Sequence, residues 1–341
     1  MNLNELALNK RYREFRGELV THFWDFQRKH FQNKEELFER LFDLNNPNRP
    51  PVFKREHGDY NVLVNETWGD KTKKDIKAMI FDMEKHRWFP SMTSSQALAQ
   101  SVFGNLTVLG KLNCLASLTG DDGKPLFIRG TYYPGQLKME HVIMYLGETA
   151  RKTHVDVFWG GDFQVAVECK LLEREVGSCS RPKLREKTPS YSEQYCRGCY
   201  TKQMGRDKRC SLTQIGIKYW EHVPWFFSWD PNIDHDPCPL NDTYQLVRNV
   251  LAASLKVSAD NEDGENAEGV DGHAVLIYDE RNPEFLKGGK GWLAWEKTKE
   301  GLKKGKESLL QKCTWQQIIS AMKRDPELSW LVDMLHEKYG F

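Results

Sequence analysis

Three charged residues in the middle of the chain have the types and spacing of a hydrolytic site. Asp156, Glu168 and Lys170 fall within the stretch THVDVFWGGDFQVAVECKL. Carboxylate oxygens with few nitrogen neighbours suit Mg²⁺ or Mn²⁺, which keep several waters and bind substrate phosphates. Such a metal, bound by Asp156 and Glu168, would acidify a water, and the lysine could orient that water or stabilise developing charge. The pattern predicts phosphodiester hydrolysis.

The strands that carry these residues decide which side chains share a face. Residues 153 to 159 and 163 to 171 read as two strands joined by a glycine-rich turn. Side chains alternate along a strand, so Glu168 and Lys170 share one face and Cys169 points to the other. The strand pair therefore has to bring the aspartate to the first of these faces.

The length of the turn decides whether Asp156 reaches that face. A two-residue loop would put Asp156 opposite Val165, away from Glu168. A three-residue loop, formed by residues 160 to 162, would put it opposite Ala166 and diagonal to Glu168. We predict the three-residue turn, with its odd number of residues, because its two glycines suit a hairpin with a bulge.

The same charges could instead form the polar face of a half-exposed hairpin, since exposed charges are common. Their apolar neighbours in VAVECKL indicate a central strand, where unpaired carboxylates would be costly. We therefore favour a site.

The stretch THVDVFWGGDFQVAVECKLLE resembles the core motif of the PD-(D/E)XK nuclease superfamily, in its restriction-endonuclease-like bacterial branch. Asp156 matches the motif aspartate, Glu168 the acidic residue and Lys170 the lysine, while Val155 stands in place of the motif proline. The resemblance implies a Mg²⁺-dependent DNA endonuclease that acts in restriction or phage defence. It also implies an α/β (α+β) fold, with a mixed central sheet flanked by helices and an N-terminal helical lobe.

In this family a glutamate on the core helix before the motif often joins the metal site. Residues 137 to 150 read as that helix, where Glu140 matches by place and Glu148 is the competitor. The resemblance extends over roughly residues 94 to 285. It includes the stretches SSQALAQSVFGNL, CSRPKLR, RCSLTQIGIKYW and YQLVRNVLA.

Five of the eight cysteines follow the motif and could hold a second metal. They are Cys179, Cys196, Cys199, Cys210 and Cys238. The pair Cys196 and Cys199 has zinc-ligand spacing, but the other intervals do not fit a standard finger. Some nucleases of the resembling superfamily carry an iron–sulfur cluster. Zinc, an iron–sulfur cluster and buried free thiols all stay open.

Basic residues accumulate in the same part of the chain, although the net charge is only +1. Residues 170 to 218 hold twelve Lys or Arg and five Asp or Glu, interleaved with tyrosines. This composition suits DNA phosphates, with a solvated loop as the alternative. The run from 287 to 306 is basic too, and we interpret it as an exposed helix. The expected DNA contacts are Arg181, Lys183, Arg185, Lys187, Lys202 and Arg206.

Several polar residues near the motif have two interpretations. Gln245, Arg248 and Asn249 share one face of a helix, which could touch the site or DNA or be a surface stripe. His141 and His154 flank the acids and could carry protons, but each is more often a structural histidine.

The elements divide the chain into a mainly helical lobe, residues 1 to 125, and a mixed core, residues 126 to 341. The core contains a Cys-rich basic insertion at about 175 to 215 and ends in helices, opened by a capping box of Thr314 and Gln317. The lobe is expected to hold helices over 3 to 32, from the N-cap Asn33, over 72 to 88 and after Ser94. The core is expected to hold a helix over 243 to 256, an acidic loop over 257 to 272 and a strand over 273 to 279.

Composition excludes several protein classes. A chain of 341 residues with 39% hydrophobic residues is too apolar for disorder and too long for a disulfide-stapled miniprotein. It has no run of 18 apolar residues and no signal-peptide pattern at its start, so we expect a cytoplasmic protein without a membrane span.

The expected partner is DNA, and a homodimer would supply the two active sites that a double-strand cut needs. The alternative is an inactive DNA-binding or assembly module with a structural cysteine–metal site. Retention of all three motif residues favours the enzyme.

Overall fold

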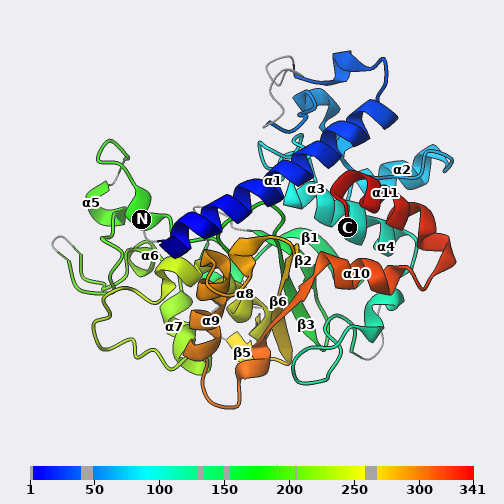
Figure 1. The fold of residues 1–341 in the computed structure, drawn as a ribbon. Helices are drawn as coiled ribbons and strands as arrows, with labels where there is room; N and C mark the ends of the chain where they lie inside the picture. The colour runs from blue at the N-terminus through cyan, green and yellow to red at the C-terminus, as the bar shows by residue number, and fades with distance from the viewer. Residues whose placement is uncertain are drawn as a thin grey trace.

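A five-stranded mixed sheet forms the centre of the computed structural model, as predicted (Figure 1). The structure describes residues 3–39, 49–129, 134–148, 154–189, 191–203, 206–257 and 267–341. In spatial order the strands are β1 (Leu137–Val142), β2 (His154–Trp159), β3 (Gln164–Cys169), β6 (Gly272–Tyr278) and β7 (Leu310–Thr314).

Strand β3 is the central strand, as its apolar sequence predicted. It pairs antiparallel with β2 on one side and parallel with β6 on the other. Strand β1 extends the antiparallel side and β7 the parallel side. All six residues of β3 are buried, because helices cover both faces of the sheet at this position.

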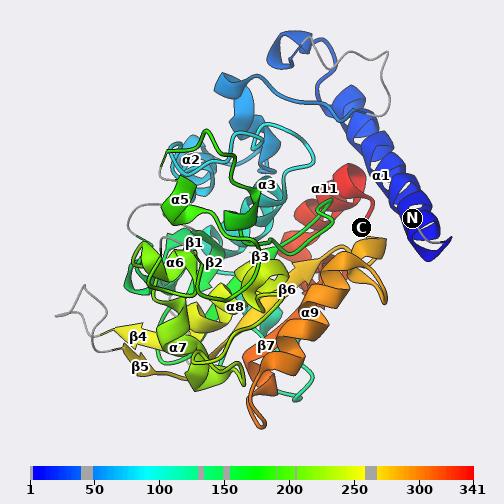
Figure 2. The same ribbon diagram turned by 90° about the vertical axis from the view of Figure 1, so that its left-hand side faces the viewer.

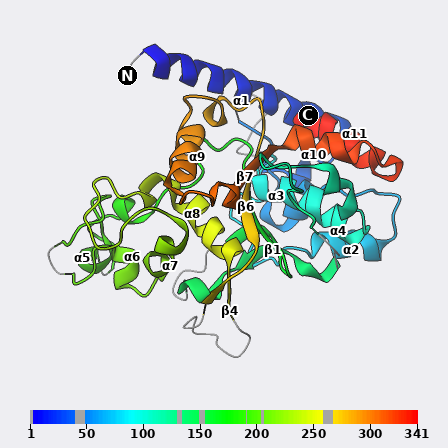
Figure 3. The same ribbon diagram turned by 90° about the horizontal axis from the view of Figure 1, so that it is seen from below.

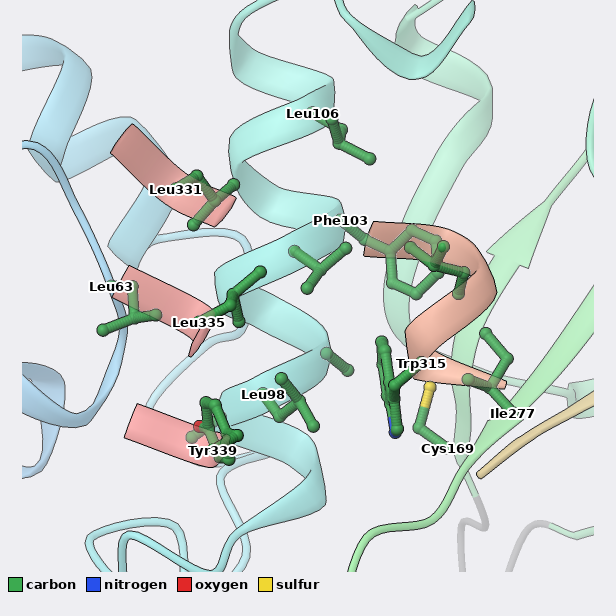
Figure 4. Packing of buried hydrophobic residues seen from close by; sticks show 14 of the residues in the cluster. Leu63, Leu98, Phe103, Leu106, Cys169, Ile277, Trp315, Leu331, Leu335 and Tyr339 are labelled. Carbon is green, nitrogen blue, oxygen red and sulfur yellow. The ribbon is translucent and has the colours of Figure 1, made fainter. Parts of the chain in front are cut away.

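Helices from both ends of the sequence cover one face of the sheet (Figure 1). Ser94 caps α3 (Ser95–Ala99), which continues through a π-helical turn (Gln100–Gly104) into α4 (Asn105–Val108). Next to them lie α10 (Trp315–Met322), which opens with the predicted capping box, and α11 (Ser329–Tyr339). Figure 4 shows Cys169 and Ile277 of the sheet packed with Phe103 and Trp315 of these helices.

The opposite face is covered by α8 (Leu240–Ser254), which contacts β3 and β6 directly. Helices α7 (Tyr219–Phe226) and α9 (Lys290–Gly301) pack beside α8, and Figure 3 shows the sheet between the two helical layers. The chain from β3 to α8 is mostly irregular, with short helices α5 (Tyr191–Gln194) and α6 (Ser211–Gln214).

Two predicted N-terminal helices are shorter than expected. Helix α1 (Leu3–His30) is confirmed and packs along α11. The helix expected from Asn33 is only a 3₁₀ turn (Glu35–Leu37), because Phe38 leaves it to form a β-bridge with Phe53; residues 40–48 lie outside the described part. Helix α2 (Asp70–Lys77) ends early, and turns occupy 78–90.

The helix predicted over residues 137–150 is wrong. Strand β1 occupies its first half, followed by a 3₁₀ turn (Met144–Leu146). The apolar pattern of these residues fits the period of a helix and that of a strand, and hydrogen bonds to β2 stabilise the strand.

The late elements follow the prediction more closely. Helix α8 and strand β6 lie where they were expected. A second, two-stranded sheet of β4 (Leu255–Val257) and β5 (Ala267–Gly269) frames the predicted acidic loop (Figure 2). Residues 258–266 of that loop lie outside the described part. Among the helices that the structure describes, none combines the length and apolar character that a membrane span requires.

Lys338 of α11 is a fully buried lysine that ties the C-terminal helix to the N-terminal lobe. Its Nζ donates to the backbone carbonyl and to Oδ1 of Asn61, at 2.6 and 2.8 Å. Burial lowers the pKa of Lys338 from its ordinary value of 10.5 to about 7. The folded protein therefore holds fewer protons than the unfolded chain between these two values.

We expect the free energy of unfolding to rise with pH between about 7 and 10, relative to a Lys338→Met variant. Because the pKa of Lys338 is lowered in the folded protein, the unfolded state binds more protons in this range. The free energy of unfolding therefore rises by up to about 1.4 kcal/mol per pH unit. Urea unfolding of both proteins at several pH values measures the difference. A difference that stays constant across this range contradicts the prediction.

Candidate active site

The four predicted catalytic residues line one cleft of about 660 Å³. They are Asp156, Glu168, Lys170 and Glu140. The cleft lies where β3 ends, and Gln245 and Arg248 of α8 and residues from the 83–96 segment complete its walls. The structure thus brings together the motif residues that the sequence places on different strands.

The connection between β2 and β3 has an odd number of residues, as predicted, but five rather than three, because the last pair of the register is Trp159 with Val165. The bend covers Gly161 to Phe163, and Phe158, rather than Asp156, pairs with Ala166. The next position along this ladder puts Asp156 opposite Glu168, closer than the predicted diagonal. Its Oδ2 accepts a 2.7 Å hydrogen bond from the backbone N–H of Cys169, which holds the aspartate at the end of β3.

Glu168 is buried and has a charged or polar partner on each carboxylate oxygen. Its Oε1 lies 2.8 Å from Nζ of Lys170. Its Oε2 accepts a 2.9 Å hydrogen bond from Asn249 and lies 3.7 Å from Nη2 of Arg248. A buried carboxylate without such partners would be strongly destabilising, so these contacts explain why the central strand tolerates it.

The polar face of α8 belongs to the site rather than to the surface. Gln245 accepts a 3.0 Å hydrogen bond from Nζ of Lys170, and Arg248 donates to the backbone carbonyl of His154 at 2.6 Å. Gly177, with φ of 113°, passes so close to Gln245 that a Cβ atom there would overlap the amide. The sequence left open whether this polar face touches the site or is a surface stripe, and the packing shows that it touches the site.

Glu140 reaches the cleft from strand β1, not from the predicted helix. It occupies the position opposite Asp156 and has φ of 48°, a left-handed conformation that is costly for a residue with a side chain. Gln96 lowers the pKa of its carboxyl group, and Nδ1 of His154 lies 3.5 Å away. Burial, with a smaller contribution from the negative charge of Glu168, raises the pKa of Glu140 to about 7.

The competitor Glu148 and the flanking His141 have other surroundings. Glu148 is buried against the hydroxyl group of Tyr219 and does not line the cleft. The ring of His141 stacks on Phe158 with 4.8 Å between centroids, and burial lowers its pKa to about 4. His141 is thus a packed histidine, whereas His154 lines the cleft.

Negative charge dominates the electrostatics of the cleft. Burial raises the pKa of Asp156 well above its ordinary value, and the carboxylates Glu168 and Glu140 raise it further. Burial alone would lower the pKa of Lys170, but Glu168 and other nearby carboxylates raise it more. A cation in the cleft would relieve this repulsion. In the described part of the chain, no three His, Cys, Asp or Glu side chains already surround a common metal position.

The five cysteines are all buried free thiols. Burial raises the pKa of Cys179 to about 11 and that of Cys238 further. Among the described residues, no three His, Cys, Asp or Glu side chains are already set to share a metal. Zinc and an iron–sulfur cluster stay predictions. The set is Cys179, Cys196, Cys199, Cys210 and Cys238.

Four of the six predicted DNA contacts are exposed, and two are not. Lys183, Arg185, Lys187 and Lys202 present their side chains to solvent. The structure contradicts the surface position expected for Arg181 and Arg206, because both side chains are buried. The guanidinium group of Arg181 instead donates to Gln194 and Ser180.

Sequence reasoning missed one wall of the cleft. Met83, His86, Trp88 and Gln96 line it, although they precede the motif by more than fifty residues. From the sequence, Gln96 could be assigned only to the first turn of a capped helix and not to the site. No local pattern connects these residues to the motif, since only the packing of the N-terminal lobe brings them there.

A family model described as "Restriction Endonuclease associating with ARP" matches residues 26–340. The match includes every residue of the cleft named above. The chain matches no curated protein and no solved structure.

We expect Asp156→Asn to be more stable than the wild type at neutral pH when no divalent cation is present. The raised pKa means that ionised Asp156 is disfavoured in the fold, so removal of its charge relieves a cost of the order of 1 kcal/mol per pKa unit. The advantage should grow as pH rises above the ordinary pKa of aspartate and vanish in acid. Thermal melts in EDTA across this range check it, and equal melting temperatures throughout would show that the repulsion is absent.

Proposed function

Because the chain belongs to the family of restriction endonucleases associating with ARP, we propose that it is a metal-dependent DNA endonuclease of the PD-(D/E)XK type. The observation that carries the proposal is the meeting of Asp156, Glu168, Glu140 and Lys170 in one cleft. A surface hairpin would leave these charges in solvent. Here they are brought together at the end of a central strand, where the burial of Glu168, Lys170 and Glu140 is costly without a functional reason.

The donor set fits Mg²⁺ or Mn²⁺. These ions usually take one or two carboxylates and complete their coordination with water and substrate phosphate, so three preset protein ligands are not required. Asp156 and Glu168 would hold the ion, and Glu140 faces the same space. Burial, and after it the repulsion of Glu168 and Glu140, raises the pKa of Asp156, and a bound cation would offset both effects.

The bound ion would supply an acidified water and neutralise charge on the scissile phosphate. Lys170 would orient that water or stabilise the developing negative charge. Its position is held from two sides, by Glu168 at 2.8 Å and by Gln245 at 3.0 Å. Asn249 is a positioning residue, because it bonds Glu168 and does not line the cleft, whereas Arg248 lies 3.7 Å from Glu168 and also lines the cleft.

DNA is the substrate that we propose, bound in part by the exposed residues Lys183, Arg185, Lys187 and Lys202. These follow β3 directly in the chain and carry the positive charge that a phosphate backbone needs. A homodimer would cut both strands, and restriction or phage defence is the role that we propose. The family description further suggests that the protein acts together with ARP.

We expect Asp156→Ala to abolish Mg²⁺-dependent DNA cleavage, a loss of at least about 10²-fold, while DNA binding persists. Cleavage of plasmid and linear DNA, with and without Mg²⁺, measures the effect. The matched control is Asp162→Ala, which removes an exposed aspartate from the turn between the same two strands and should retain activity. Cleavage by the purified Asp156→Ala protein would disprove the assignment.

The combined change Lys183→Ala, Arg185→Ala and Lys187→Ala should weaken DNA binding and make it less sensitive to salt. Each phosphate that is no longer neutralised by a basic side chain lowers the slope of log affinity against log salt by about 0.9. Binding titrations at several salt concentrations give the slope.

A parallel change to alanine of three exposed lysines from the other basic run, Lys287, Lys290 and Lys304, serves as comparison. It should leave the slope near the wild-type value. If both variants keep the wild-type slope, the region after β3 does not contact DNA.

A further inference from the structure

The wall of the cleft that precedes α3 exposes large apolar side chains. Phe81, Met83 and Trp88 are 66%, 91% and 49% exposed. Met83 and Trp88 line the cleft itself, and the exposed Phe81 precedes Met83 by two residues in the chain. Single exposed apolar residues need no explanation, but three within eight residues beside a catalytic cleft indicate a contact surface. We call residues 81–88 the rim.

The rim has no regular secondary structure, yet its backbone is held firmly. The N–H of His86 donates to Oε1 of Gln96 at 2.9 Å, and Nε2 of the same amide donates to the carbonyl of Glu84 at 3.1 Å. Nζ of Lys85 bonds Asp82 at 2.7 Å and Asp59 at 2.5 Å. These bonds turn the polar groups of the rim inward and leave its apolar side chains outside.

The same amide connects the rim to the catalytic carboxylates. Gln96 also lowers the pKa of Glu140, so the side chain that holds the rim interacts with the acidic group as well. The guanidinium of Arg87 lies 5.3 Å from the ring centroid of Trp88, which puts a cation beside an exposed aromatic face. An aromatic ring with an adjacent cation suits a nucleotide, which offers a base and a phosphate together.

The position of the rim favours nucleic acid over a protein partner. Trp88 and Met83 share their cleft with Asp156 and Lys170, so an occupant that covers them also fills the place of the substrate. A protein bound there would block the proposed reaction. A base that flanks the scissile phosphate would not.

We propose that a DNA base next to the scissile phosphate leaves its stack and packs on Trp88, with Met83 as the second apolar wall. The enzyme then acts on DNA that is locally unpaired or distorted at the point of cleavage. This inference rests on the proposed function, because it takes the phosphate to lie at Asp156. Stacking of a base on an aromatic side chain supplies the free energy that opens the helix locally.

The test uses the full chain with Asp156→Ala, so that DNA is bound without being cut. Its probes are a short duplex with one unpaired 2-aminopurine and the same duplex fully paired. Trp88→Ala is compared with Trp225→Ala, which removes a 44% exposed tryptophan from α7, away from the cleft. Met83→Ala provides a second variant at a site too exposed to affect folding.

We expect the unpaired probe to bind more tightly than the paired one and its fluorescence to be quenched. Trp88→Ala should weaken binding of the unpaired probe by about 5- to 150-fold, remove the preference and restore fluorescence. Met83→Ala should act in the same direction, and Trp225→Ala should change nothing.

The inference is overturned if Trp88→Ala and Met83→Ala bind both probes as Trp225→Ala does while the protein with Asp156 intact cuts DNA. It is also overturned if Trp88→Ala loses only the association with a protein partner. A protein with Asp156 intact that neither binds nor cuts DNA with Mg²⁺ would instead overturn the proposed function, and the inference with it.

Discussion

The site depends on the burial of a charged pair at the end of a central strand. Glu168 and Lys170 lie at the end of β3 on the face toward α8, where little of either side chain is exposed to water. Each ion therefore needs a second partner from the protein. Asn249 and Gln245 provide it, which fixes how α8 must lie on the sheet. The helix is thus a structural layer and the inner wall of the cleft at once.

The alternation of side chains along β3 divides the molecule into its two layers. Cys169 points away from the charged pair into the core formed with α3, α10 and α11 (Figure 4). On that side the indole N–H of Trp315 donates to the backbone carbonyl of Lys170 at 3.0 Å. Helix α10 thus supports the same residue that α8 holds from the other face. This shared support explains why residues far apart in the chain converge on one strand end.

The two predicted metal sites differ in what their metals demand. A hydrolytic Mg²⁺ site needs one or two carboxylates beside an open space, and the cleft provides both. A structural zinc site needs four ligands around the ion, and the region after β3 offers five buried cysteines for it. The buried cysteines contribute packing to the loop-rich region between β3 and α8, where regular secondary structure is scarce.

The sequence by itself determined the two motif strands, the odd number of residues that connects them, and helix α8. It also determined the alternation that separates Cys169 from Glu168 and Lys170. All of these follow from local periodicity and turn chemistry. Only the tertiary structure decided that Glu140 arrives on a strand, that Arg248 and Asn249 face Glu168, that Arg181 and Arg206 are buried, and that the rim faces the cleft. Each of these depends on hydrogen bonds or packing between segments distant in the chain. Such partners leave no local pattern, since an amphipathic stretch fits helix or strand equally well until its neighbour is in place.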